Sequence, residues 1–266
     1  MPKALLARVA EASRIVECPA NHRLWDEDVQ PGFTAILWRG YLRMPRYSLE
    51  GRRQIVSIIC PGEIVGEGVD TRPGYGMEAV TAVTFCRFER GEFRRLADRE
   101  PELRRALLRQ HMKRLEVLRW LTWSLGLQTP EERLCAFLAR ACETMPYQPL
   151  PDGSGILSLE VPRADVADLL GTTKETISRL THRLQQIGLI EIRDPRHFRI
   201  FDRERLAKVG GLSPARPNSS ERPGIAAVRR GLGASEGAAQ RAARAALSGP
   251  SLPMSLPGGS AAVASS

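Results

Sequence analysis

The chain has 266 residues and a net charge of +9 at neutral pH. This length suits two domains, and the positive charge favours a polyanionic partner without by itself demonstrating nucleic-acid binding. No run of eighteen apolar residues is present, which argues against a membrane-spanning helix, and no known catalytic motif stands out, so we do not expect an enzyme.

The N-terminus and the cysteines favour a reducing compartment. Residues 1–6 lack a long apolar signal region, and the cysteines are odd in number and widely scattered: Cys18, Cys60, Cys86, Cys135 and Cys142. We therefore predict a cytoplasmic protein with reduced thiols. The first three cysteines are interpreted as small apolar residues of strands, with a thiol switch as the alternative.

Residues 1–100 are predicted to form an all-β sensor domain. Short runs rich in β-forming residues, such as residues 35–44 and 54–59, are separated by glycine turns. This rhythm is typical of an antiparallel barrel or roll.

A long helix is predicted over residues 101–127. Pro101 fits a first-turn position, and residues 102–125 contain no Gly or Pro, enough for a rod of about 36 Å. The leucines Leu108, Leu115, Leu118 and Leu125 fall on alternating steps of seven and three residues, and His111 and Thr122 fill the remaining seam positions. This pattern predicts a parallel two-helix dimer interface. A helix that packs only on its own roll is the alternative.

Residues 128–208 are predicted to form a domain that contains a helix-turn-helix. The first helix has apolar residues at helical intervals and ends at a glycine: Val166, Leu169, Leu170 and Gly171. We expect Thr172 to cap the second helix, which has an apolar stripe: Ile177, Leu180, Leu184 and Ile187. After Gly188, residues 189–192 and 198–200 alternate like a hairpin, which adds a wing.

Polar residues on the second helix and its turn predict a contact with the DNA major groove: Thr172, Thr173, Lys174, Glu175, Ser178, Arg179, His182 and Arg183. Arg179 can donate two hydrogen bonds to a guanine, Glu175 can accept one from a cytosine amino group, and Ser178 is small enough to touch a base. The last two residues of the set suit phosphates. The alternative is a capping box between Thr172 and Glu175, with Arg179 as a solvated charge.

Residues 209–266 differ from the rest of the chain. Gly, Ala, Ser, Pro and Arg dominate, and aromatic residues, Cys, Lys and Asp are absent. Because this composition cannot bury a core, we predict a disordered tail.

Residues 163–200 resemble the winged helix-turn-helix of the Crp/Fnr family of bacterial transcription regulators. Residues 175–179, Glu-Thr-Ile-Ser-Arg, are similar to the Glu-x-x-Ser-Arg signature of the Fnr and FixK branch. The resemblance implies a homodimeric activator that reads a palindromic TTGAT-N4-ATCAA-like site and contacts RNA polymerase. It also implies that Arg179 reads the guanine, Glu175 its paired cytosine and Ser178 the outer thymine. Lys174 departs from the Fnr branch, which commonly has an aliphatic residue there.

The likeness extends over about residues 15–205. Trp38-x-Gly40, Gly51 and residues 61–67 resemble a cyclic-nucleotide-binding-like β-roll. The implied fold class is α+β, with an N-terminal β-roll, a long dimerisation helix, a C-terminal winged helix-turn-helix and a disordered tail. Regulators of this branch often control low-oxygen respiration, denitrification or nitrogen fixation.

No cofactor is expected. Nucleotide-binding relatives hold the cyclic phosphate with Arg-Ser or Arg-Thr, whereas Arg72 is followed here by Pro73, which has neither a hydroxyl nor an N–H. Oxygen-sensing Fnr proteins bind an iron-sulfur cluster through close-spaced N-terminal cysteines, but only Cys18 lies near this N-terminus. The alternatives are a regulator that responds to a cyclic nucleotide, or to haem or gas through His22 or His111, and a ligand-sensing module that docks a protein partner.

Overall fold

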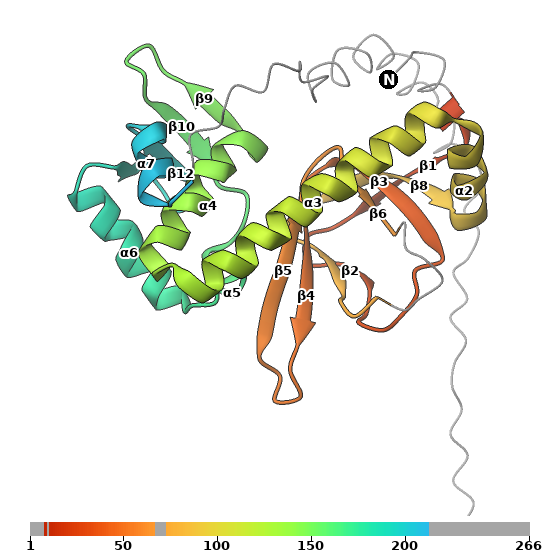
Figure 1. The fold of residues 1–266 in the computed structure, drawn as a ribbon, viewed down its shortest axis with the longest axis horizontal. Helices are drawn as coiled ribbons and strands as arrows, with labels where there is room; N and C mark the ends of the chain where they lie inside the picture. Colours follow the sequence, from red (N-terminus) through yellow and green to blue (C-terminus); the bar gives the residue numbers. More distant parts are fainter. Residues whose placement is uncertain (1–7, 10, 67–72, 213–266) are drawn as a thin grey trace, which may run out of the picture. The chain divides into compact units, whose positions relative to one another are not determined.

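The computed structural model describes residues 8–9, 11–66 and 73–212. Arg72 and nearly all of the predicted disordered tail lie outside the described residues. The described part is a mixed α+β structure, with strands in its N-terminal half and mainly helices in its C-terminal half (Figure 1).

Two antiparallel sheets make up the N-terminal half, in the orders β1-β8-β3-β6 and β2-β7-β4-β5. Leu37, Leu42, Met77 and Phe85 belong to one apolar core to which strands of both sheets contribute. This confirms the antiparallel strands predicted within residues 1–100, but the prediction that the domain is all-β was wrong, because a helix covers Arg90–Arg99. The strands are β1 (Arg14–Cys18), β2 (Arg23–Trp25), β3 (Phe33–Arg39), β4 (Leu42–Tyr47), β5 (Arg53–Ile59), β6 (Ile64–Val65), β7 (Met77–Ala79) and β8 (Val83–Glu89).

Gly40 makes the tight connection between β3 and β4 possible. Its φ of +80° lies in the left-handed region, and a Cβ there would stand 2.3 Å from the carbonyl oxygen of Ala82. Only glycine fits this combination of backbone conformation and close approach.

Two helices follow the strands: α2 (Arg90–Arg99) and α3 (Pro101–Leu127). Pro101 occupies the first turn of α3, as predicted, because its missing N–H would have no intrahelical partner there. Leu103 packs in a cluster with Phe88 and Phe93. The side-chain amide of Gln110 accepts from the Ile64 N–H at 3.0 Å and donates to the Ile64 carbonyl at 2.9 Å. One face of α3 is therefore fastened to the β-rich part.

The C-terminal half has a second apolar core, which includes Phe137, Leu157, Leu184 and Phe198. A four-stranded antiparallel sheet in the order β11-β12-β10-β9 lies beside its helices. The hairpin β11-β12 confirms the predicted wing, and β9 and β10 extend it. The elements are α4 (Pro130–Thr144), β9 (Tyr147–Pro149), β10 (Gly155–Ser158), α5 (Arg163–Leu169), α6 (Lys174–Gln186), β11 (Ile190–Ile192), β12 (His197–Ile200) and α7 (Arg203–Val209).

Helix α4 begins at a capping box between Thr129 and Glu132. The Glu132 N–H donates to the Thr129 hydroxyl at 3.3 Å, and the Glu132 carboxylate accepts from the Thr129 N–H at 2.7 Å. Two otherwise unpaired backbone donors are satisfied in this way.

No helix in the described part of the chain is long and apolar enough to cross a membrane.

Candidate nucleic-acid interface

Helices α5 and α6 are joined by a tight turn at Gly171. This residue has a φ of +60°, and the N–H of Thr172 donates to the carbonyl of Ala167 at 3.0 Å. Gly188 ends α6 in the same manner, since its φ is +68° and the N–H of Leu189 donates to the carbonyl of Leu184 at 3.0 Å. Both helices therefore end at a left-handed glycine, as the sequence predicts, and α6 also has the second hydrogen bond of a Schellman motif, from the Gly188 N–H to the Gln185 carbonyl at 3.0 Å.

The cap of α6 is Thr173, and the prediction of Thr172 was wrong. The Thr173 hydroxyl accepts from the Thr176 N–H at 3.2 Å, whereas the N–H of Thr172 is used to close α5. The chain needs one further residue after the glycine to reverse direction before helical dihedrals begin. A capping box between Thr172 and Glu175 does not form, so the Glu175 carboxylate is not used in capping.

The apolar stripe of α6 is buried at Ile177, Leu180 and Leu184. Ile187 is 48% exposed, so its placement in the buried stripe was wrong. It is the C-cap residue, where the backbone has left the helical path ahead of Gly188. Instead it lines an open hollow together with polar and basic residues of α6, among them Arg179, His182 and Arg183.

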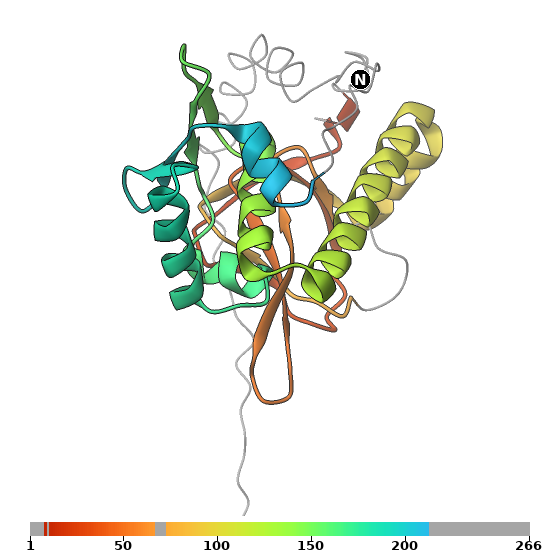
Figure 2. The ribbon, with the colours of Figure 1, turned by 60° about the vertical axis from the view of Figure 1, so that its left-hand side comes forward.

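The opposite face of α6 carries the predicted DNA contacts. Lys174, Glu175, Arg179, His182 and Arg183 are exposed, as is the capping residue Thr173, while Thr172 and Ser178 are half-buried. Among the described residues, Glu175 and Arg179 have no hydrogen-bond or ion-pair partner. Their donors and acceptors are available to a partner outside the chain. The wing lies beside this helix (Figure 2).

Arg183 is engaged within the chain. Its Nε lies 3.0 Å from Oε2 of Glu131 in the first turn of α4. Sequence reasoning assigned Arg183 to phosphates and missed this partner, because the two residues are 52 positions apart and no local pattern relates them.

The tip of the wing is ordered by Asp194. Its carboxylate accepts from the backbone N–H groups of Arg196 and His197 at 2.8 and 2.9 Å and lies 2.7 Å from the His197 ring. The hydrogen bonds from the Arg196 backbone and the His197 ring hold the pKa of Asp194 below its usual range. Arg193 remains exposed at this tip.

The seam predicted on α3 is largely uncovered. Leu108 is 64% exposed, and His111, Leu115, Leu118 and Thr122 are also exposed. Leu125 differs, since it is half-buried against the apolar core of the C-terminal half. The helix therefore carries a row of exposed leucines, while its other face is packed against its own chain.

The cysteines are all free thiols, and none lies fully at the surface. Burial raises the pKa of Cys60 and Cys135 to about 12 and that of Cys142 to about 11. Such thiols react slowly because the thiolate is scarce at neutral pH. The described residues contain no group of three or more His, Cys, Asp or Glu side chains arranged to hold a metal ion.

Two protein-family models match the chain. A cyclic nucleotide-binding domain matches residues 15–100, and a Crp-like helix-turn-helix domain matches residues 132–209. Both agree with the predicted fold class.

Curated relatives cover most of the same region. The nitrogen fixation regulation protein FixK of Bradyrhizobium diazoefficiens is 32% identical over 167 residues, which are 63% of this chain and 69% of the relative. A probable transcriptional activator of Rhizobium leguminosarum bv. viciae is 31% identical and covers 68% of this chain and 74% of its own length. The transcriptional activator protein FnrL of Cereibacter sphaeroides is 28% identical, covering 71% and 76%.

Among solved structures, FixK2 from Bradyrhizobium japonicum superposes with a TM-score of 0.68 at 21% identity, covering 76% of this chain and 99% of that chain. A CooA mutant from Carboxydothermus hydrogenoformans gives a TM-score of 0.65 at 20% identity, covering 76% and 90%. At these identities the likeness concerns the fold.

Proposed function

The chain belongs to the Crp/Fnr family of transcription regulators, among its FixK-like members, and from this premise we propose that it activates transcription as a homodimer bound to a palindromic TTGAT-N4-ATCAA-like site. Family membership makes it a DNA-binding regulator and not an enzyme. The proposal adds the DNA site, the dimer and a contact with RNA polymerase.

The observation that carries the proposal is the open polar face of α6. Glu175 and Arg179 are exposed one helical turn apart and lack partners among the described residues. In our proposal Arg179 donates to guanine O6 and N7, Glu175 accepts from the amino group of the paired cytosine, and Ser178 touches the outer thymine. Lys174, His182 and Arg183 contact DNA phosphates, and the turn residues Thr172 and Thr173 approach the sugar-phosphate backbone of the DNA.

The dimer is supported by the exposed leucines of α3. Two copies of this helix packed in parallel would bury Leu108, Leu115 and Leu118 in one seam. A two-fold axis along this seam presents two α6 helices to a palindrome, whose half-sites are spaced by about one helical turn.

We also propose a role for each segment of the chain. We assign residues 1–100 to a sensor roll, 101–127 to the dimerisation helix, 128–208 to the DNA-binding domain and 209–266 to a tail. The FixK relatives regulate nitrogen fixation, and control of nitrogen fixation or of another low-oxygen process in the cytoplasm is the setting we propose for this chain.

Fluorescence anisotropy of the purified full chain, in air and without added ligand, tests the proposal. The duplexes carry TTGAT-N4-ATCAA, a TGTGA palindrome or scrambled DNA at one fixed salt concentration. We expect tight binding to the first alone. Equal binding to all three duplexes, or preference for TGTGA, would contradict the proposed site.

The dimer is tested separately by sedimentation of Leu115→Glu. The expected result is a folded monomer with weakened binding to the palindrome. Val117→Glu, on the same helix but outside the seam, is the matched control and should stay dimeric. A wild-type chain that sediments as a monomer when bound to the palindrome would contradict the homodimer.

A further inference from the structure

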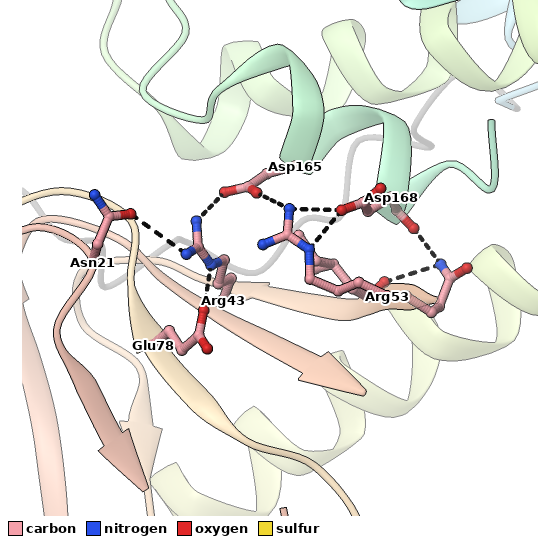
Figure 3. A network of polar contacts seen from close by, with 8 residues as sticks. Asn21, Arg43, Arg53, Glu78, Asp165 and Asp168 are labelled. Atoms are coloured by element: carbon pink, nitrogen blue, oxygen red, sulfur yellow. Dashed lines mark hydrogen bonds and ion pairs between the residues drawn. The ribbon is translucent and has the colours of Figure 1, made fainter. Parts of the chain in front are cut away.

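A polar network, buried at Arg43 and Asp165 and partly exposed at Arg53 and Asp168, joins the hairpin β4-β5 to α5, the helix that precedes α6 (Figure 3). At its centre lies Arg43 of β4, which is 9% exposed. Its Nε donates to Oε2 of Glu78 at 2.9 Å, and its Nη1 donates to Oδ2 of Asp165 at 2.7 Å. Asn21 accepts a longer hydrogen bond, 3.4 Å, from Nη2 of the same guanidinium.

A second arginine reaches the same helix. Arg53 of β5 donates from Nη2 to the other oxygen of Asp165 at 2.7 Å and from Nε to Oδ2 of Asp168 at 2.6 Å. Beside it the side-chain amide of Gln54 donates to the backbone carbonyls of Asp168 and Leu169 at 2.5 and 3.3 Å. The hairpin therefore holds both the carboxylates and the C-terminal carbonyls of α5.

The network is directional in a way that the apolar packing around it is not. Ile55 of the hairpin lies in the apolar cluster of the C-terminal half, and the hydrophobic effect that favours this burial has no preferred direction. A guanidinium instead presents its N–H groups in a planar fork with fixed angles. Two forks on one carboxylate define where α5 lies on the hairpin, because any rotation would leave a buried charge without a partner.

The orientation of α5 determines the orientation of α6, the helix that carries the proposed base contacts. Only the turn at residues 170–173 separates α5 from α6, and the two helices pack on each other. We propose that Arg43 and Arg53 are positioning residues that set the orientation of α6 relative to the dimerisation helix, and thereby the spacing of the two half-sites that the dimer accepts. This inference rests on the proposed palindrome-reading dimer.

A fixed orientation of α6 restricts the spacer length because of the geometry of DNA. One base pair of added spacer moves a half-site by about 3.4 Å and turns it by about 35° around the duplex axis. A dimer whose DNA-binding domains are fixed rejects such a change, whereas one whose domains can swivel on residues 128–129 accommodates it.

The test measures the affinity of the full chain for palindromes with two to six base pairs of spacer. The variants are Arg53→Gln and the double variant Arg43→Gln/Arg53→Gln. Arg52→Gln is the matched control, since Arg52 lies on the same hairpin, is exposed and pairs only with Glu50 among the described residues. Circular dichroism and sedimentation verify that each variant is a folded dimer.

We expect the wild type and Arg52→Gln to prefer one spacer length. In the variants the ratio of affinities between the best spacer and its neighbours should fall by about fivefold or more, the lower end of typical coupling between two sites. Base preference within a half-site should not change. If Arg43→Gln/Arg53→Gln does not fold, Arg53→Gln alone carries the test, because Arg53 is more exposed than Arg43.

Unchanged spacer selectivity in a folded variant would overturn the inference. A wild type that binds no spacer length specifically would overturn the proposed function instead. A uniform loss of affinity at every spacer length would mean that the arginines contribute to stability or to general DNA attraction and do not set spacing.

Discussion

Helices α5 and α6 belong to one motif, yet a charged residue of α5 is buried and paired, whereas one of α6 is exposed and unpaired among the described residues. Asp165 of α5 is 2% exposed and is held by two arginines of the hairpin. Arg179 of α6 is exposed and has no partner among the described residues. The charge that holds α5 to the hairpin is therefore paired within the chain, whereas the charge that we propose for base recognition is left open to solvent.

The largest effect is expected for Asp165→Ala. It leaves Arg43 and Arg53 partly buried without their shared carboxylate, so we expect unfolding free energy to fall by about 3 to 5 kcal/mol. Urea titration measures the loss. Asp26→Ala removes an exposed ion pair with Arg23 and should cost less than about 1 kcal/mol. Equal losses of unfolding free energy in both variants would mean that the network stabilises the protein no more than an exposed ion pair does.

For Arg179→Ala we expect a small effect on stability and a large effect on DNA recognition. The side chain is exposed, so unfolding free energy should change by less than about 0.5 kcal/mol. Discrimination at one base pair should fall by about 1 to 3 kcal/mol, measured by anisotropy on duplexes with single substitutions. Arg205→Ala, an exposed arginine of α7, is the control. Loss of affinity that is the same for every sequence would assign Arg179 to a phosphate.

The two C-terminal glycines give a matched pair on the two helices. Alanine in the left-handed region costs about 1 to 2 kcal/mol, so both Gly171→Ala and Gly188→Ala should destabilise the protein. At Gly171 the added Cβ would stand 2.9 Å from Cδ2 of Leu125, while nothing lies within 4 Å at Gly188. Thermal unfolding should therefore show the larger loss for Gly171→Ala. The reverse order would mean that Leu125 moves aside without cost.

The smallest effect is expected for Glu131→Gln, which releases Arg183 from its ion pair. The pair is partly exposed, so stability should change by less than about 1 kcal/mol. A freed arginine that meets a phosphate should steepen the dependence of log affinity on log salt by about 0.9. Glu143→Gln, which frees Arg203 on α7, is the control. An unchanged slope would mean that releasing Arg183 from Glu131 adds no phosphate contact.

Local patterns were sufficient for much of the fold. The helix predicted over residues 101–127 has those bounds, because Pro101 fits the first turn and no proline follows within the helix. The same holds for Gly171 and Gly188, where a left-handed residue ends each helix. The position of the α6 cap was missed by one residue, since two adjacent threonines carry the same chemistry and only the hydrogen bond that closes α5 distinguishes them.

The residues that form the helix-turn-helix and the polar groups that α6 presents could be predicted from the sequence, since i, i+3 and i+4 periodicity and glycine conformations are local properties. The ion-pair partners of the charged side chains could not be predicted, because they depend on how distant segments pack. The pairing of Arg43 with Asp165 spans 122 positions, and that of Arg183 with Glu131 spans 52. An arginine carries the same charge whether it is buried against a carboxylate or exposed to solvent, and the packing of distant segments alone makes the difference.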